Sequence, residues 1–331
     1  MITVSDKKPT AAAQAAIQNG PIFIIGAPRS GTTLLQYMLR SHPRISLPTG
    51  ESHFIVPLYR EAESFGDLQN QDNIRRVLNE MYRRNASFLD TDLHGLKFNT
   101  DVLSQQLHQQ GMTTIPQLIR AMMELNAKGE GKQRWGDKTP YYSLHVPLIM
   151  EMFPDAQILH IIRDGRDCAL SMLERGKDLD IHNIHHAARI WKQYVDAGQT
   201  AGRLLDSSQY YEFRYEDLLQ SQLDVVSGIC NYLGEEFSES VINYRKASGS
   251  GKTPLLKQPI RAGNSEKWKI RMNRRQIRVF EGIAGDTLAE NGYTVTAGKG
   301  ALSKPVTVFY KAHQRLGSWR SQRDKRKSVR G

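Results

Sequence analysis

The fold is decided by one stretch, Pro21-Ile22-Phe23-Ile24-Ile25-Gly26-Ala27-Pro28-Arg29-Ser30-Gly31-Thr32-Thr33. Residues 21–25 are apolar and predict a buried strand. Residues 32–40 predict a helix, because their apolar members fall on one face at helical spacing. A strand, a glycine-bounded loop and a helix in this order form the setting in which backbone N–H groups at a helix N-terminus bind a phosphate.

The loop, residues 26–33, has the spacing of a P-loop, with four residues between Gly26 and Gly31 and two threonines directly after Gly31. A nucleotide triphosphatase carries lysine where this chain has Thr32, and the cation of this loop is Arg29 instead. An ordinary strand-to-helix turn would account for the glycines, but not for an arginine and three hydroxyl groups beside them. We therefore expect the loop to bind a phosphate-like group other than the β and γ phosphates of ATP.

A second predicted strand is also followed by a polar loop and a helix, and here charged residues come directly after the strand. Residues 157–162, Gln-Ile-Leu-His-Ile-Ile, run into Arg163, and Ser171 lies one to two turns into the helix that follows. Strands that alternate with helices predict a mostly parallel sheet covered on both faces. Such folds bind ligands at the carboxyl ends of their strands, so both motifs are expected at that edge.

Together, the two motifs resemble those of sulfotransferases that use 3′-phosphoadenosine-5′-phosphosulfate (PAPS), with most similarity to the protein-tyrosine branch and its soluble bacterial relatives. The resemblance runs from about residue 21 to about residue 275. It implies a P-loop-like fold, PAPS as co-substrate, 3′,5′-adenosine diphosphate as product, and no required metal. It also implies a 5′-phosphosulfate site made of Arg29, Ser30, Gly31, Thr32 and Thr33, and a 3′-phosphate site made of Arg163 and Ser171.

The resemblance extends to catalytic residues. Gly50-Glu51 matches the Gly-Glu pair whose glutamate takes the acceptor proton in the tyrosine branch, so Glu51 is the expected general base, with a pKa raised by partial burial. Lys138 matches a family lysine that neutralises the bridging oxygen of the donor, and Arg29 is expected to hold the transferring group with it. The small-molecule branch uses a histidine base, which leaves His53 and His94 as alternatives.

Two later segments complete the donor site that the resemblance implies. Tyr215 matches a tyrosine of the adenine pocket, although a core aromatic residue at a strand end would look the same. A loop over residues 248–263 and the following residues are expected to close on PAPS, with Arg261, Gly263 and Lys267 as contacts. The small-molecule branch has Arg-Lys-Gly in this loop, whereas this chain has alanine at position 262.

The organisation predicted along the chain is a single α/β domain with a helical insertion. Residues 1–20 are expected to form a flexible arm, and residues 21–300 the sulfotransferase domain. Within that domain, residues 61–130 carry apolar residues at helical spacing and are expected to form a cap over the acceptor site. Residues 216–233 predict one helix that stops at Gly234. Residues 301–331 are a basic tail.

Charge and cysteine content restrict the setting in which this protein works. The formal net charge is +11, and residues 301–331 hold nine Lys or Arg against one acid, which is +8 of it. The tail is expected to be solvated and partly disordered, with weak contact to a membrane surface as an alternative. Two cysteines exclude a disulfide framework, and neither a signal peptide nor a membrane span is evident, so a cytoplasmic enzyme is expected.

Other functions are less well supported by the sequence. A small-molecule kinase shares the strand, loop and helix, but it needs a lysine at position 32 and acids that bind Mg²⁺. A nucleic-acid-binding protein would need basic stripes with interleaved aromatic residues, so no nucleic acid is expected as partner. The sequence leaves the acceptor open among small molecules, glycans, lipids and peptide tyrosines. It also leaves open whether oxygen or nitrogen is sulfated and whether the chain forms a homodimer. Histidines 182, 185 and 186 have metal-ligand spacing, but they are better explained as one face of a helix.

Overall fold

The computed structural model describes residues 19–244, 262–297 and 302–328. Its centre is a sheet of five strands in the order β2-β3-β1-β4-β5, and every neighbouring pair is parallel. The strands are β1 (Ile22–Ile25), β2 (Ile45–Ser46), β3 (Arg134–Lys138), β4 (Gln157–Ile162) and β5 (Tyr210–Arg214). The predicted α/β class with a mostly parallel sheet is therefore confirmed.

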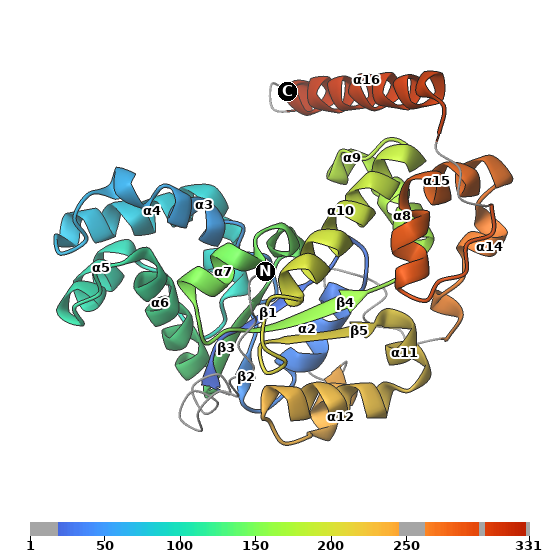
Figure 1. Ribbon diagram of the computed structural model, residues 1–331. Helices are drawn as coiled ribbons and strands as arrows, with labels where there is room; N and C mark the ends of the chain where they lie inside the picture. The colour runs from blue at the N-terminus through green and yellow to red at the C-terminus, as the bar shows by residue number, and fades with distance from the viewer. Residues whose placement is uncertain (1–18, 245–261, 298–301, 329–331) are drawn as a thin grey trace, which may run out of the picture.

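Helices cover both faces of the sheet (Figure 1). Between β1 and β4 the chain forms α2 (Thr32–Arg40), α3 (Ile55–Arg60), α4 (Gln71–Ser87), α5 (Thr100–Gln109), α6 (Ile115–Gly129) and α7 (Val146–Met152). After β4 come α8 (Gly165–Glu174), α9 (Gly176–Leu179), α10 (Ile184–Gly202), α11 (Tyr215–Gln220), α12 (Gln222–Leu233) and α13 (Glu239–Ile242). The last helices are α14 (Trp268–Arg271), α15 (Arg274–Glu290) and α16 (Lys304–Ser328). Short turns of other helix types are η1 (Ala62–Phe65), η2 (Phe88–Asp92), η3 (Pro140–Leu144) and η6 (Ala262–Asn264).

Successive side chains of β1 point to opposite faces of the sheet and join two separate hydrophobic clusters. Phe23 and Ile25 pack with the side chains of α3 to α7, whereas Ile22 and Ile24 pack with α2, α12 and α13. All four side chains are fully buried, and burial of each stabilises the fold by roughly 1.5–3 kcal/mol. The strand is thereby fixed in place, and with it the start of the loop that follows Ile25.

Strand β3 is built from residues that a sequence pattern does not mark as a strand. Arg134, Asp137 and Lys138 are all buried, and Gly136 lies so close to β1 that an added Cβ would come within 2.5 Å of the Ile22 carbonyl oxygen. The Arg134 guanidinium donates hydrogen bonds to the backbone carbonyls of Gly20, at 2.6 Å, and Leu233, at 2.7 Å. Polar partners inside the protein therefore offset the burial of this charged strand.

Two predicted segments differ from the structure. The helix expected over residues 216–233 is two helices, α11 and α12, because Ser221 between them has a non-helical backbone with φ −132° and ψ 59°. The tail expected to be solvated and partly disordered is a helix, α16, from Lys304 to Ser328. The domain bounds and the cap role of residues 61–130 stay predictions, although that segment is helical as expected.

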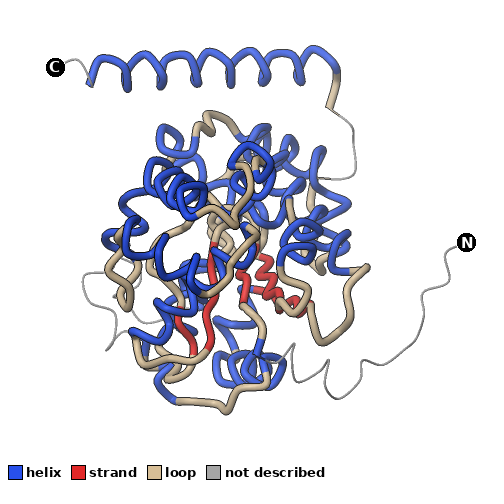
Figure 2. The backbone as a smooth tube through the Cα atoms, turned by 90° about the vertical axis from the view of Figure 1, so that its left-hand side faces the viewer, coloured by secondary structure: helices blue, strands red, loops and turns tan. Residues whose placement is uncertain are grey.

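Helix α16 lies at one end of the molecule, beside the start of α10 (Figures 1 and 2). It contacts α10, where the His185 ring stacks on Tyr310, and the residues between α9 and α10, where the His182 backbone N–H donates to Gln314 Oε1 at 2.9 Å. Within the described ranges, no helix combines the length and the apolar character that crossing a bilayer requires.

Candidate active site

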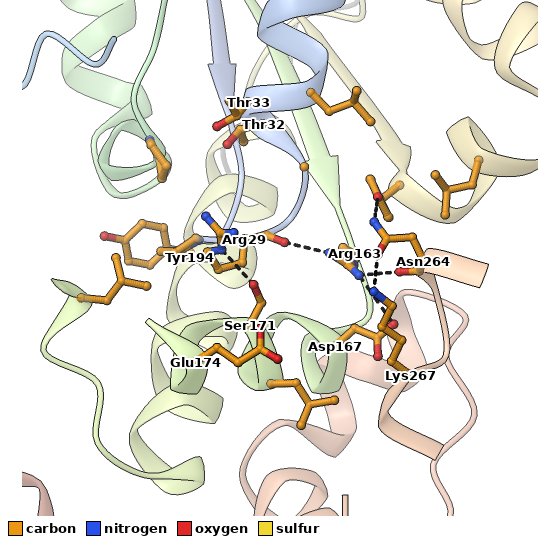
Figure 3. A pocket seen from close by; sticks show the side chains of 18 of the residues that line it. Arg29, Thr32, Thr33, Arg163, Asp167, Ser171, Glu174, Tyr194, Asn264 and Lys267 are labelled. Atoms are coloured by element: carbon orange, nitrogen blue, oxygen red, sulfur yellow. Dashed lines mark hydrogen bonds and ion pairs between the residues drawn. The ribbon is translucent and has the colours of Figure 1, made fainter. Parts of the chain in front are cut away.

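A pocket of about 720 Å³ opens where β1 and β4 end, at the edge of the sheet that the sequence predicts (Figure 3). Most of the predicted site residues line it: Arg29, Gly31, Thr32, Thr33, Glu51, Arg163, Ser171, Tyr215, Gly263 and Lys267. Ser30 and Lys138 are buried beside these residues and are not part of the lining. Arg261 lies outside the described residues.

The loop after β1 presents backbone N–H groups and a cation to the pocket. Gly26, Arg29 and Gly31 have φ values of 155°, 71° and 107°, and Arg29 thus holds a left-handed conformation that is uncommon for a residue with a Cβ. Helix α2 begins at Thr32 without a side-chain cap, so the partial positive charge of its N-terminus faces the site. An added Cβ on Gly31 would lie 2.6 Å from the Tyr215 ring, which explains the second glycine.

Arg29 joins the two predicted phosphate sites. Its Nε donates a hydrogen bond to Ser171 Oγ at 2.9 Å, across 142 residues of sequence (Figure 3). Burial, together with the positive charges of Arg175 and Arg163, lowers the pKa of Arg29. A site crowded with cations in this way gains stability when an anion binds.

Arg163 is held at the end of β4 by backbone oxygens. It donates to the carbonyl of Arg29 at 3.2 Å and to that of Asn264 at 2.6 Å, and its guanidinium lies 4.5 Å from the centre of the Tyr215 ring. Its carboxylate neighbour, Asp167, is 3.9 Å away, and its buried Nε has no hydrogen-bond partner in the described structure. Arg163 therefore keeps hydrogen-bonding capacity for a ligand.

A short chain of hydrogen bonds closes the same side of the pocket. Asn264 donates from Nδ2 to the Tyr215 hydroxyl at 2.6 Å, and it accepts at Oδ1 from Lys267 Nζ at 2.6 Å. Asn264 was not predicted as a site residue. Its position next to Gly263, in a loop already expected to close on the donor, was the only signal for it.

Glu51 lies between two cationic side chains at the other side of the pocket. Lys138 Nζ donates to Glu51 Oε1, and His53 Nε2 lies 3.2 Å from Oε2. Burial alone would raise the pKa of Glu51, but hydrogen bonds and charge from His53 and Lys138 lower it to about 2. The expected upward shift is thus wrong for the resting site, because burial was weighed without these cations. The pKa of His53 is raised by its hydrogen bond to Glu51.

A buried carboxyl group supports this arrangement from behind. Asp137 accepts hydrogen bonds from Ser52 Oγ at 2.5 Å, from the Tyr142 hydroxyl at 2.5 Å and from the Lys138 backbone N–H at 2.8 Å. Burial raises the pKa of Asp137, whose side chain is fully inside the protein. The segment that carries Glu51 is thereby tied to the strand that carries Lys138.

The remaining lining residues are ones that the sequence did not single out. Tyr141, Tyr194, Leu170 and Leu179 give the pocket an apolar part. None of its lining residues comes from 61–130, a segment that the structure describes throughout. Among the described residues there is also no group of three or more His, Cys, Asp or Glu placed to hold a metal ion.

This arrangement has the chemistry of a site for an anionic ligand next to a proton acceptor. Arg29, Arg163 and Lys267 supply positive charge on one side, and the α2 N-terminus supplies backbone donors. Glu51 supplies a carboxylate on the other side of the same cavity. Such a site can hold a negatively charged group and remove a proton from a second reactant.

Several proteins of known name are similar to this chain in sequence. A putative protein-tyrosine sulfotransferase of Caenorhabditis briggsae is 23% identical over 69% of this chain and 70% of its own length. The protein-tyrosine sulfotransferase of Drosophila melanogaster is 22% identical over 86% of this chain and 54% of its own length. Omega-hydroxy-beta-dihydromenaquinone-9 sulfotransferase Stf3 of Mycobacterium bovis is 25% identical over 67% of this chain and 64% of its own length. The chain thus spans about half to two thirds of these relatives.

Solved structures share the fold. The sulfotransferase domain of the Synechococcus PCC 7002 olefin synthase matches with a TM-score of 0.54 and 23% identity, over 84% of this chain and 98% of that one. The sulfotransferase domain of the curacin biosynthetic pathway matches with a TM-score of 0.55 and 20% identity, over 84% and 99%. The model of the sulfotransferase family covers residues 21–239, which include the loop after β1, Glu51, Lys138, Arg163 and Ser171. The chain belongs to the sulfotransferase family.

Proposed function

We propose that this chain transfers a sulfuryl group from PAPS to a hydroxyl or amine of an acceptor. The observation that carries the proposal is that residues assigned to both ends of the donor, and to the base, line one cavity. They come from sequence positions as far apart as Arg29 and Lys267. Family membership supports the reaction class, and the relatives named for tyrosine and menaquinone sulfation support a hydroxyl as the acceptor group.

In this proposal the donor lies across the carboxyl ends of β1 and β4. The 5′-phosphosulfate binds the N–H groups and Arg29 of the loop after β1, and the 3′-phosphate binds Arg163 and Ser171. The adenine lies against Tyr215, with Gly263 and Lys267 closing over it. The hydrogen bond of 2.9 Å between Arg29 and Ser171 supports this placement, because it brings one residue of each proposed anion site into contact.

The reaction would be one in-line displacement. An acceptor oxygen or nitrogen forms a bond to sulfur while the bond from sulfur to the bridging oxygen of the 5′-phosphate breaks. The acceptor proton goes to Glu51, and 3′,5′-adenosine diphosphate leaves with the electron pair of the broken bond. Arg29 and the N-terminus of α2 stabilise the charge on the equatorial oxygens, as in phosphoryl transfer.

Lys138 has two roles in this scheme, because it cannot hold Glu51 and the donor with full strength at once. In the resting site Lys138 is paired with Glu51, whose pKa of about 2 makes it a weak base. When Lys138 turns to the bridging oxygen of the donor, Glu51 loses a cation and its pKa rises. Binding of the donor would therefore activate the base, with His53 keeping the carboxylate oriented.

Calorimetric titration with 3′,5′-adenosine diphosphate tests the donor assignment directly. We expect binding without metal and no binding of ATP, with or without Mg²⁺. The matched control is Arg271→Ala, which removes a pocket-lining arginine that pairs with Glu174 at 2.7 Å and should leave the affinity nearly unchanged. ATP binding that depends on Mg²⁺, without binding of the adenosine diphosphate, would replace the proposal with a kinase.

A further inference from the structure

Helix α16 contacts the body of the protein through Tyr310, which is buried and stacks on the His185 ring with 5.7 Å between ring centres, and through small and polar side chains. Gln314 Nε2 donates to the Asp180 carbonyl at 2.6 Å, and Ser318 Oγ donates to Asp180 Oδ2 at 2.9 Å. An added Cβ on Gly317 would lie 2.4 Å from the His182 ring, so this glycine permits the close approach of the two segments. The contact face therefore combines one buried aromatic ring with specific polar contacts.

The opposite face of α16 is apolar and exposed. Val308 is 64% exposed, Phe309 56%, Leu316 46% and Trp319 56%. At 3.6 residues per turn, these residues and the exposed Ala312 lie on the side of the helix away from Gln314. We call these five residues the outer stripe. A surface helix normally turns its apolar residues to the core, whereas α16 packs Val306 and Tyr310 there and still leaves the outer stripe exposed.

Positive charge borders the outer stripe. Residues 304–328 contain eight Lys or Arg and one acid, Asp324, which gives a net charge of +7 for this helix. At helical spacing Lys311 and Arg315 lie along one side of the stripe and Arg320 along the other. The Arg323 guanidinium lies 5.0 Å from the centre of the Trp319 ring, at the end of the stripe.

From these observations we infer that α16 binds the surface of an anionic phospholipid bilayer through the outer stripe. An apolar stripe with Phe and Trp, bordered by Lys and Arg, fits the boundary between lipid headgroups and acyl chains. The apolar side chains enter that boundary, while the cations pair with anionic headgroups and keep contact with water. The helix is held parallel to the membrane by its contacts with Asp180 and His182. This inference does not depend on the proposed reaction.

Trp319 makes the test direct. Trp135, Trp191 and Trp268 are at most 4% exposed, so quenching of tryptophan fluorescence by acrylamide reports mainly on Trp319. We would add vesicles of phosphatidylcholine with phosphatidylserine, or of phosphatidylcholine alone, to the full chain. The phosphatidylserine vesicles should protect Trp319 from acrylamide and shift its emission to shorter wavelength. High salt should weaken this effect, and pure phosphatidylcholine should give little of it.

Two double variants separate the apolar from the charged contribution to vesicle binding, and both keep Trp319 as the reporter. Phe309→Ser with Leu316→Ser should weaken partitioning to phosphatidylserine vesicles by roughly 10-fold or more, since two large apolar groups no longer leave water. Lys311→Gln with Arg315→Gln should weaken it by a similar factor. The matched control is Leu204→Ser with Leu223→Ser, which removes two leucines that are 81% and 55% exposed elsewhere and should change nothing.

Three results would overturn the inference. One is the absence of protection by phosphatidylserine vesicles. Another is self-association in size-exclusion chromatography that the Phe309 and Leu316 substitutions abolish while vesicles have no effect, which would make the stripe an interface between two copies. The last is binding of an oligonucleotide, without vesicle binding, that depends on Lys311 and Arg315 but not on Phe309.

Discussion

The pocket has a donor side, with Arg29 and Arg163, and a base side, with Glu51. The two sides differ in the partners that their charged groups already have. On the donor side, Arg29 and Arg163 donate to neutral groups, namely Ser171 Oγ and the backbone carbonyls of Arg29 and Asn264. On the base side, the carboxylate of Glu51 already has Lys138 and His53 as partners. The donor side thus has positive charge to offer an incoming anion, whereas in the proposed reaction the base side has to give up a contact before Glu51 can accept a proton.

Removal of the carboxylate on the base side should have the largest effect. Glu51→Gln keeps the shape but takes away the proton acceptor, so kcat should fall by about 10² to 10⁴-fold, while affinity for 3′,5′-adenosine diphosphate changes only a few-fold. Steady-state kinetics and calorimetry measure the two quantities. Glu174→Gln is the control, because Glu174 also lines the pocket but pairs with Arg271. A kcat close to that of the unsubstituted protein would place the base elsewhere, with His53 as the first alternative.

On the donor side, Arg163→Ala should weaken binding of 3′,5′-adenosine diphosphate by roughly 10 to 100-fold, because charge-assisted hydrogen bonds to a phosphate are lost. Calorimetry measures this loss, and the melting temperature shows whether the variant is folded. Arg163→Lys should recover part of the affinity. Equal affinity in all three proteins would mean that the cations on this side serve the fold and not the ligand.

The pairing on the base side can be tested through pH. Because the pKa of Glu51 is about 2, it stays deprotonated through the mildly acidic range, and kcat/KM should show no acid limb from this group there. Lys138→Met removes a cation that favours the deprotonated form. The pKa of Glu51 should therefore rise by about one unit or more, and the acid limb should move to higher pH by the same amount. Profiles with the same limb in both proteins would show that Lys138 does not control the base.

The smallest effect is expected at the junction between the two phosphate sites. Ser171→Ala removes one proposed contact to the 3′-phosphate and one neutral hydrogen-bond partner of Arg29, so affinity for 3′,5′-adenosine diphosphate should fall by about 3 to 10-fold. The same substitution in an Arg29→Lys background should cost less, because the two side chains act through one contact. Additive losses in this double-mutant cycle would show that Ser171 binds the ligand independently of Arg29.

Local sequence pattern predicted the donor side better than the base side. The apolar strands β1 and β4 are visible as runs, and the loop after β1 and Arg163 follow them directly. Strand β3 was missed because its charged residues are satisfied by partners distant in sequence, such as Gly20 and Leu233. The predicted rise in the pKa of Glu51 was wrong because two neighbours lower it: His53, two residues along the chain, and Lys138, 87 residues away.

Two further features could not be predicted, for different physical reasons. Asn264 belongs to the site only because its side chain bridges Tyr215 and Lys267, and such a bridge has no motif. The charge of α16 suggested a solvated tail, yet polar contacts with residues 180–182 hold the helix against the body. The contacts of Asn264 with Tyr215 and of α16 with residues 180–182 join segments far apart in the chain.

The buried carboxyl group of Asp137 couples opening of the site to unfolding of the core. Since it accepts from Ser52, from Tyr142 and from the backbone of Lys138, the segment with Glu51 cannot swing away from β3 without exposing an interior acid. Opening of the base side and loss of the sheet are then one cooperative event. Amide hydrogen exchange at Lys138 should accordingly be as slow as in β1, so that this half of the site has no partly unfolded state of its own.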